Sequence, residues 1–192
     1  MNHVNLTAVT GLVHHLAGKK NSEYFPFSIR HDNTWTDGTA RKDFLNARAA
    51  KPELQETLKA LPENSPVRVK GSLRTSKGSG ELFLAVTEIE PLKDLPAQPE
   101  NSAELSGNVH IIKAQQEGEN ATGRYIRFAV RQEEQDANGH TTRDFLVVRV
   151  YDDEQKKILD TLSDGDPVHV LGTMRSSRGS GVNYVRCVKI GQ

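Results

Sequence analysis

Aromatic and arginine side chains alternate with apolar ones in three segments of the second half of the chain, 123–131, 145–151 and 184–187. Because successive residues of a strand point to opposite faces, this pattern separates an inward apolar stripe from an outward face. The residues expected on the outward face are Tyr125, Arg127, Arg131, Phe145, Arg149, Tyr151, Tyr184 and Arg186. Rings beside guanidinium groups can stack on unpaired bases and meet phosphates. The pattern therefore predicts a surface for single-stranded nucleic acid.

The first half of the chain has a thinner version of this surface, with Ala50 at the position of Tyr151. Its expected outward residues are Tyr24, Arg30, Phe44, Arg48, Arg68, Lys70 and Phe83. Trp35, in the loop after the second predicted strand, is either a further stacking residue or a half-buried packing residue. The alternative for every ring is packing under a loop or against the other half, which would leave no stacking surface.

Two glycine-rich loops, 74–80 and 175–181, each carry a basic pair. The pairs are Arg74 with Lys77, and Arg175 with Arg178. Glycine lets backbone N–H groups approach phosphate oxygens, while the basic side chains add charge. An ordinary solvated hairpin has a similar composition. Because both loops keep the basic pair, we expect phosphate contacts from all four side chains.

Other chemistry has little support in the sequence. His14 and His15 are adjacent in a predicted strand, so they point to opposite faces and cannot hold one ion. The single cysteine, Cys187, leaves no Cys/His zinc spacing and is expected to pack inward. Asp43 and Asp144 recur, but neither has a partner carboxylate at fixed spacing. We therefore expect no metal, no cofactor and no catalytic residue, and we do not expect an enzyme.

The two halves are copies of one unit. The segment that begins at Pro66 returns at Pro167, a separation of 101 residues (167 − 66), and Tyr24 returns at Tyr125 with the same separation. Between the copies lies a segment with three prolines, which is typical of an extended linker. We expect a first domain over residues 1–92, a linker over 93–101 and a second domain over 102–192.

Within each copy, short alternating segments between turn residues predict strands, and the stretches 52–61 and 152–162 predict a helix. The pairs Asp37-Gly38 and Asn138-Gly139 favour type I′ hairpin turns, in which both central residues have positive φ. The order of elements predicts an all-β chain of two tandem OB-fold five-stranded barrels, each with a short helix between strands 3 and 4.

The composition limits the cellular setting. Lys and Arg number 25, as do Asp and Glu, so the net charge is zero, whereas nucleic-acid binders are often basic. Binding responds to local potential, so a basic face remains compatible with this total. No apolar run approaches the roughly 20 residues of a membrane span, and the first residues lack the pattern of a signal peptide. With one cysteine, these features favour a cytoplasmic protein without membrane contact.

The run from Phe145 to Tyr151, the following helix and the strand at 167–175 resemble the third strand, helix and fourth strand of bacterial single-stranded DNA-binding proteins. Primosomal PriB proteins share the pattern. The resemblance implies that Phe44, Phe145 and Tyr151 stack on bases, and that the loop after the fourth strand is basic. It also implies a homodimer that presents four OB-folds, with replication or recombination proteins as partners. The acidic recruiting tail of that family is not expected, because the sequence ends after the last predicted strand.

Two hypotheses of different class follow. The first is a single-stranded DNA-binding protein that coats and protects DNA in replication, recombination or conjugative transfer. RNA stays open as a second ligand, because stacking on bases tolerates both. The second is a PriB-like replication adaptor that acts mainly through protein–protein contacts.

Overall fold

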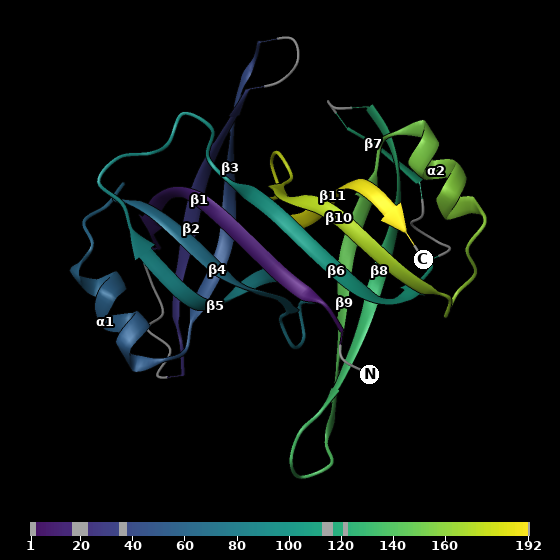
Figure 1. The fold of residues 1–192 in the computed structure, drawn as a ribbon, viewed down its shortest axis with the longest axis horizontal. Helices are drawn as coiled ribbons and strands as arrows, with labels where there is room; N and C mark the ends of the chain where they lie inside the picture. Colours follow the sequence, from purple (N-terminus) through teal and green to yellow (C-terminus); the bar gives the residue numbers. More distant parts are fainter. Residues whose placement is uncertain (1–2, 17–22, 35–37, 113–116, 121–122, 192) are drawn as a thin grey trace.

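A computed structural model describes residues 3–16, 23–34, 38–112, 117–120 and 123–191 of the chain (Figure 1). Its first unit, residues 5–91, contains five strands and one helix in the predicted order. These elements are β1 (Asn5–His15), β2 (Phe25–Thr34), β3 (Ala40–Ala49), α1 (Pro52–Ala60), β4 (Pro66–Thr75) and β5 (Leu82–Pro91). The pairings β1–β2, β2–β3, β3–β5, β5–β4 and β4–β1 close a five-stranded barrel, so the prediction is confirmed for this half.

The second unit, residues 101–191, has one strand more than predicted. Its elements are β6 (Asn101–His110), β7 (Glu117–Asn120), β8 (Gly123–Gln135), β9 (Thr141–Val150), α2 (Asp153–Asp160), β10 (Pro167–Ser176) and β11 (Asn183–Gly191). β6 pairs with β10 and, over three residue pairs, with β8. β9 pairs with β8 and, in parallel, with β11. The added strand β7 pairs with the start of β8.

The helices lie at the outer ends of the two units (Figure 1). α1 begins at Pro52, whose fixed φ suits the first helical position and whose missing N–H would have no partner there. α2 begins after Asp152, whose side chain accepts a hydrogen bond from the backbone N–H of Gln155 at 3.0 Å. α1 falls between β3 and β4, as predicted, and α2 lies at the equivalent place between β9 and β10, which are the fourth and fifth strands of the second unit because β7 is added.

The inward faces of the strands form the core, as the alternation indicates. Phe27, Ile29 and Leu45 are fully buried in the first unit, and Phe128 and Leu146 in the second. Glycine is needed at Gly71 and Gly172, where the ladders to β5 and β11 shift register. A Cβ at Gly71 would lie 2.1 Å from the carbonyl oxygen of Ala85, and one at Gly172 would lie 2.4 Å from that of Arg186.

The turn between β8 and β9 differs from the expected type I′ form. Gly139 has a φ of 82°, but Asn138 is not among the described residues with positive φ. The turn is wider, because the backbone N–H of Asp136 bonds to the carbonyl oxygen of His140 at 2.9 Å. The Asp136 carboxylate accepts from the N–H groups of Asn138 and His140, which holds this wider turn without a left-handed asparagine.

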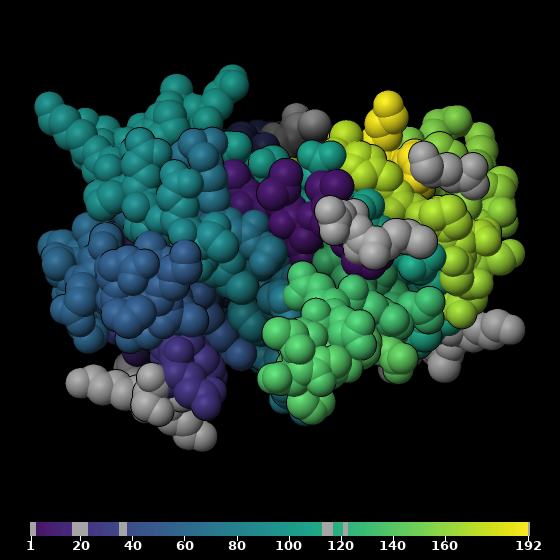
Figure 2. All heavy atoms as spheres, turned by 60° about the horizontal axis from the view of Figure 1, so that its bottom comes forward, coloured from purple at the N-terminus to yellow at the C-terminus, as the bar shows by residue number. Residues whose placement is uncertain are grey.

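A single β-sheet runs through both units, because β1 pairs with β6 in antiparallel register from Asn5–Leu105 to Val9–Asn101. Figure 1 shows these two strands side by side in the middle of the molecule. In the space-filling view the purple atoms of β1 lie between the blue-teal and green-yellow halves (Figure 2). We call this β1–β6 junction the seam; it fixes the two units relative to each other.

Candidate nucleic-acid interface

The outward face is formed by side chains of β2, β3 and β5 in the first unit and of β8, β9 and β11 in the second. Pairing of β2 with β3 places Arg30 opposite Phe44, and pairing of β8 with β9 places Arg131 opposite Phe145. Phe44 is 42% exposed and Phe145 is 37% exposed, so both rings are available for stacking. The side-chain alternation predicted from the sequence is confirmed for these pairs.

Each unit also holds one guanidinium group against two rings. In the first unit Arg48 Cζ lies 4.6 Å from the ring centroid of Tyr24 and 3.9 Å from that of Phe83. In the second unit Arg149 Cζ lies 4.6 Å from Tyr125 and 4.0 Å from Tyr184. A cation over an aromatic face is attracted by the ring quadrupole, so each arginine fixes the two rings beside it. The two arginines are related by the repeat of 101 residues (149 − 48).

Tyr184 corrects the sequence prediction, because it is only 2% exposed. The ring lies on the expected side of β11, but Arg149 covers it. Burial, followed by a hydrogen bond with Tyr151, raises the pKa of Tyr184 to about 12. Tyr184 therefore supports Arg149 and does not offer a face to a base in this arrangement.

Tyr125 and Tyr151 remain half-buried on the same face, with their ring centroids 5.3 Å apart. The guanidinium group of Arg186 lies 5.2 Å from the Tyr151 ring, and the Tyr151 hydroxyl accepts a hydrogen bond from Asn120 Nδ2 at 2.7 Å. Asn120 belongs to β7, so the strand that the sequence did not predict orients one of the predicted stacking rings.

Three arginines of the second unit lie in one row across its outward face. Arg127 is opposite Arg149 in the β8–β9 ladder, and Arg149 is opposite Arg186 in the β9–β11 ladder. Like charges placed directly opposite each other in a sheet are destabilising. In the first unit the equivalent positions hold Pro26, Arg48 and Ala85, so only the central position carries an arginine. We call Arg127, Arg149 and Arg186 the arginine row.

The recurrence of Asp43 and Asp144 has a structural reason that the sequence did not reveal. Asp43 accepts hydrogen bonds from the backbone N–H of Ser176 at 2.9 Å and from Arg175 Nη1 at 3.1 Å. In the reciprocal contact, Asp144 accepts from the N–H of Thr75 at 2.8 Å and lies 2.8 Å from Arg74 Nε. Asp43 thus binds the end of β10 in the second unit, and Asp144 binds the end of β4 in the first. We call these two contacts the reciprocal clasp.

The clasp changes the role expected for two of the basic loop residues. Arg74 and Arg175 face carboxylates across the seam, so phosphate contacts from them are not supported. Lys77 and Arg178 are exposed in the loops that follow, and each loop is held against the opposite unit at its base. Trp35 lies outside the described residues.

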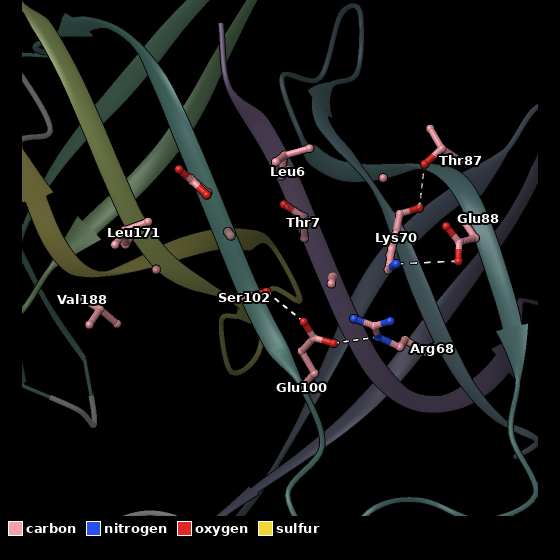
Figure 3. A pocket seen from close by; sticks show the side chains of 15 residues that line it. Leu6, Thr7, Arg68, Lys70, Thr87, Glu88, Glu100, Ser102, Leu171 and Val188 are labelled. Carbon is pink, nitrogen blue, oxygen red and sulfur yellow. Dashed lines mark hydrogen bonds and ion pairs between the residues drawn. The ribbon is translucent and has the colours of Figure 1, made fainter.

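The outer surface of the seam has a different character. A groove of about 600 Å³ lies over β1, β4, β6 and β10 (Figure 3). There Arg68 is paired with Glu100 at 2.7 Å, and Lys70 with Glu88 at 3.7 Å. The expectation that Arg68 and Lys70 join the aromatic face is therefore wrong. Both side chains line this groove, where each forms an ion pair with a glutamate.

Two histidines next to the exposed phenylalanines were missed by sequence reasoning. The His14 ring centroid is 5.6 Å from that of Phe44, and the His110 ring centroid is 4.8 Å from that of Phe145. The two histidines are 96 residues apart (110 − 14), five fewer than the repeat found elsewhere. A search for equivalent residues that allowed this shift for β1 and β6 would have paired them.

The remaining expectations concern single residues and the membrane. Cys187 is 5% exposed and faces inward, as predicted, and burial raises the pKa of its thiol to about 12. His14 and His15 turn to different rings, Phe44 and Phe25. Among the described residues we find neither a group of three or more metal-ligating side chains nor a helix long and apolar enough to span a bilayer.

Comparison with known proteins identifies the fold. No family model and no curated protein sequence matches the chain. The solved structure of the wild-type single-stranded DNA-binding protein from Thermus aquaticus matches with a TM-score of 0.72 and 15% identity, over 100% of this chain and 94% of that one. A deletion mutant of the same protein matches with a TM-score of 0.71 and 15% identity, over 99% of this chain and 94% of that one. The resemblance to bacterial single-stranded DNA-binding proteins is thus confirmed at the level of the fold, an OB-fold architecture of that kind.

Proposed function

We propose that the chain binds single-stranded DNA and protects it during replication, recombination or conjugative transfer in the cytoplasm, without covalent chemistry. Both units are proposed to be OB-fold barrels that present their outward faces to the strand. Bases stack on the exposed or half-buried rings, while arginine and lysine side chains meet the phosphates. RNA is a second ligand that the same contacts would accept.

The arginine row is the observation that carries this proposal. Three guanidinium groups in neighbouring strands repel one another, and a bound phosphate chain would relieve that repulsion. The row is flanked by Tyr125 and Tyr151, so charge and stacking surface lie together. This combination is the one that a single strand requires, because its phosphates and its unpaired bases are both accessible.

The zero net charge is compatible with the proposal because much of the acidic charge has other partners. Asp43 and Asp144 hold the reciprocal clasp. Glu88 and Glu100 balance basic side chains in the groove over the seam. Local potential governs binding, so carboxylates engaged elsewhere oppose it less than the total suggests.

A homodimer that presents four units is part of the proposal. Leu6 is 64% exposed and Val188 is 62% exposed, and both line the groove over the seam (Figure 3). A second copy of the chain would remove this apolar surface from water. The mass of the protein in solution tests this part independently of DNA binding.

The same groove favours the second candidate function, a PriB-like adaptor that acts mainly through protein contacts. On that hypothesis the apolar residues of the seam bind replication or recombination proteins, and the outward faces contribute little.

The two functions are separated by binding of the purified full-length chain to fluorescent oligo-dT, with unlabelled duplex DNA of equal length as competitor. The proposed function predicts saturable binding of oligo-dT that the duplex does not displace at equal concentration. Absence of oligo-dT binding at low salt would leave the adaptor as the better account.

A further inference from the structure

A histidine, a phenylalanine and a carboxylate meet at equivalent places in the two units. In the first, His14 Nδ1 lies 2.5 Å from Glu63 Oε1 while its ring contacts Phe44 edge-on. In the second, His110 Nδ1 lies 3.4 Å from Asp164 Oδ1 while its ring contacts Phe145. Glu63 and Asp164 are 101 residues apart (164 − 63), the spacing of the repeat. We call the two groups the histidine clusters.

The two histidines are 96 residues apart, and not 101, because β1 and β6 as a whole are related by a spacing of 96 residues. Asn5 of β1 exchanges hydrogen bonds with the backbone of Leu73, and Asn101 of β6 exchanges the same bonds with Met174. These asparagines are also 96 residues apart (101 − 5). His14 and His110 therefore occupy the same position in the two units.

Both clusters lie on the outward face proposed for nucleic acid. The ladders place Arg30 opposite Phe44 and Arg131 opposite Phe145, so each exposed ring lies opposite an arginine and is in contact with an imidazole. The side chain of His14 is 45% exposed and that of His110 is 37% exposed. Each imidazole can therefore reach a phosphate or base that lies against the adjacent phenylalanine.

Several elements beside each histidine carry charged groups. On the elements beside His14 the charged groups are Glu63 in the loop before β4, His15 on β1, Arg30 and Asp32 on β2, and Lys42 opposite Asp32 on β3. Around His110 they are Asp164 and Asp166 in the loop before β10, Arg131 and Glu133 on β8, and Arg143 on β9. Arg30 is paired with Asp32 at 2.8 Å and Arg131 with Glu133 at 3.7 Å, so the nearby positive and negative charges largely balance.

The carboxylates also have a structural task that does not involve the imidazoles. Glu63 accepts a hydrogen bond from the backbone N–H of His15 at 2.8 Å, and Asp164 accepts one from Ile111 at 3.0 Å. The backbone bond, with the His14 contact second, lowers the pKa of the Glu63 carboxyl. The acid therefore stays ionised and available to orient a protonated imidazole.

We propose that His14 and His110 contact the bound strand beside Phe44 and Phe145 and that each, once protonated, neutralises one phosphate. This inference rests on the proposed function and adds a pH-dependent component to it. Imidazole is the side chain that ordinarily changes charge between about pH 5 and 8, so binding should tighten as the pH falls through that range. Among the described residues, His14 and His110 are the histidines that occupy equivalent positions on this face in both units.

The test uses the salt dependence of oligo-dT binding by the full chain at pH 8.0 and at pH 5.5. For single strands, the slope of log K against log salt steepens by about 0.7 for each phosphate neutralised. The wild-type slope should therefore steepen by up to about 1.4 at the lower pH. His14→Asn with His110→Asn, which keeps a donor near each Nδ1, should lose the steepening.

A matched control is His169→Gln. This change alters another histidine–carboxylate pair, in which His169 of β10 lies 2.9 Å from Glu104 of β6 and neither residue contacts Phe44 or Phe145. It should keep the wild-type steepening. If both variants have the same thermal unfolding midpoint as wild type at pH 8.0, a folding defect is excluded. If wild type binds oligo-dT but its slope is the same at both pH values, or the double variant steepens equally, the inference is overturned and the proposed function stands. If wild type binds no oligo-dT at either pH, the proposed function itself fails.

Discussion

The carboxylate of Asp43 in the first unit accepts a hydrogen bond from the backbone N–H of Ser176 in the second, at 2.9 Å. Asp144 makes the reciprocal contact with Thr75 at 2.8 Å. Two copies of one ancestral segment are thus joined as two subunits of a symmetric dimer would be, with each copy binding the other through the same residues. The arrangement explains why an acidic residue at the equivalent position of β3 and β9 is kept in both copies.

Removing the Asp43 carboxylate should destabilise the fold strongly. Asp43 is fully buried and also lies 3.4 Å from Arg41, so Asp43→Ala leaves buried cations without their partner. Breaking a buried pair in this way costs about 3–5 kcal/mol, measurable as the free energy of unfolding in urea. Asp32→Ala, which breaks a surface pair with Arg30, should cost at most about 1 kcal/mol. Equal losses for the two variants would contradict the role given to the clasp.

Loss of the proposed stacking rings Phe145 and Tyr151 should weaken binding without unfolding the protein. Phe145→Ala with Tyr151→Ala should reduce affinity for oligo-dT by about 2–6 kcal/mol if each ring stacks on one base. Fluorescence anisotropy measures this change directly. Phe44→Ala, the equivalent change to Phe145→Ala in the first unit, should cost less than that single change, because the first unit lacks the arginine row and has Ala50 in place of Tyr151. Normal affinity in a folded double variant would exclude this platform.

Neutralising the outer members of the arginine row should alter the salt dependence of binding. Arg127→Gln with Arg186→Gln should make the slope of log K against log salt shallower by about 1.4, because two phosphate contacts are lost. Arg68→Gln, in the groove over the seam and paired with Glu100, is the matched control and should leave the slope unchanged. An identical slope in the double variant and wild type would remove the row from the interface.

The Cys187 thiol should resist alkylation in the folded protein. Burial first, and then the charge of Asp152, raise its pKa to about 12, whereas an unperturbed thiol has a value of about 8.5. The folded state therefore favours the neutral thiol. Its contribution to stability is complete below about pH 8.5 and is lost as the pH rises toward 12. At pH 8, iodoacetamide should modify the native protein far more slowly than the urea-unfolded protein, which mass spectrometry would detect. Equal rates would show that Cys187 is exposed.

The sequence predicted most of the fold because its signals are local. Alternation over β8 and β9 separated Phe128 and Leu146 from Arg131 and Phe145, and the structure confirms that separation. The repeat fixed the order of strands and helix in both units. β7 was missed because Glu117–Asn120 contains no apolar alternation and is held by pairing with β8.

The candidate site was predicted less completely, because its remaining features depend on contacts between distant segments. Arg74 looks like a phosphate ligand until the fold brings Asp144 beside it. Tyr184 alternates as an exposed residue would, but Arg149 covers its ring. A pattern along one strand reports which face a side chain occupies and not what lies over it.

The central claim, that the outward faces bind a single strand through stacking and phosphate contacts, is tested most directly by a salt titration of oligo-dT binding to the wild-type chain. Several phosphate contacts predict tight binding at low salt and a linear fall of log K with log salt, at about −0.7 per phosphate. Affinity that is absent at low salt, or that does not change as salt is raised, would contradict the account.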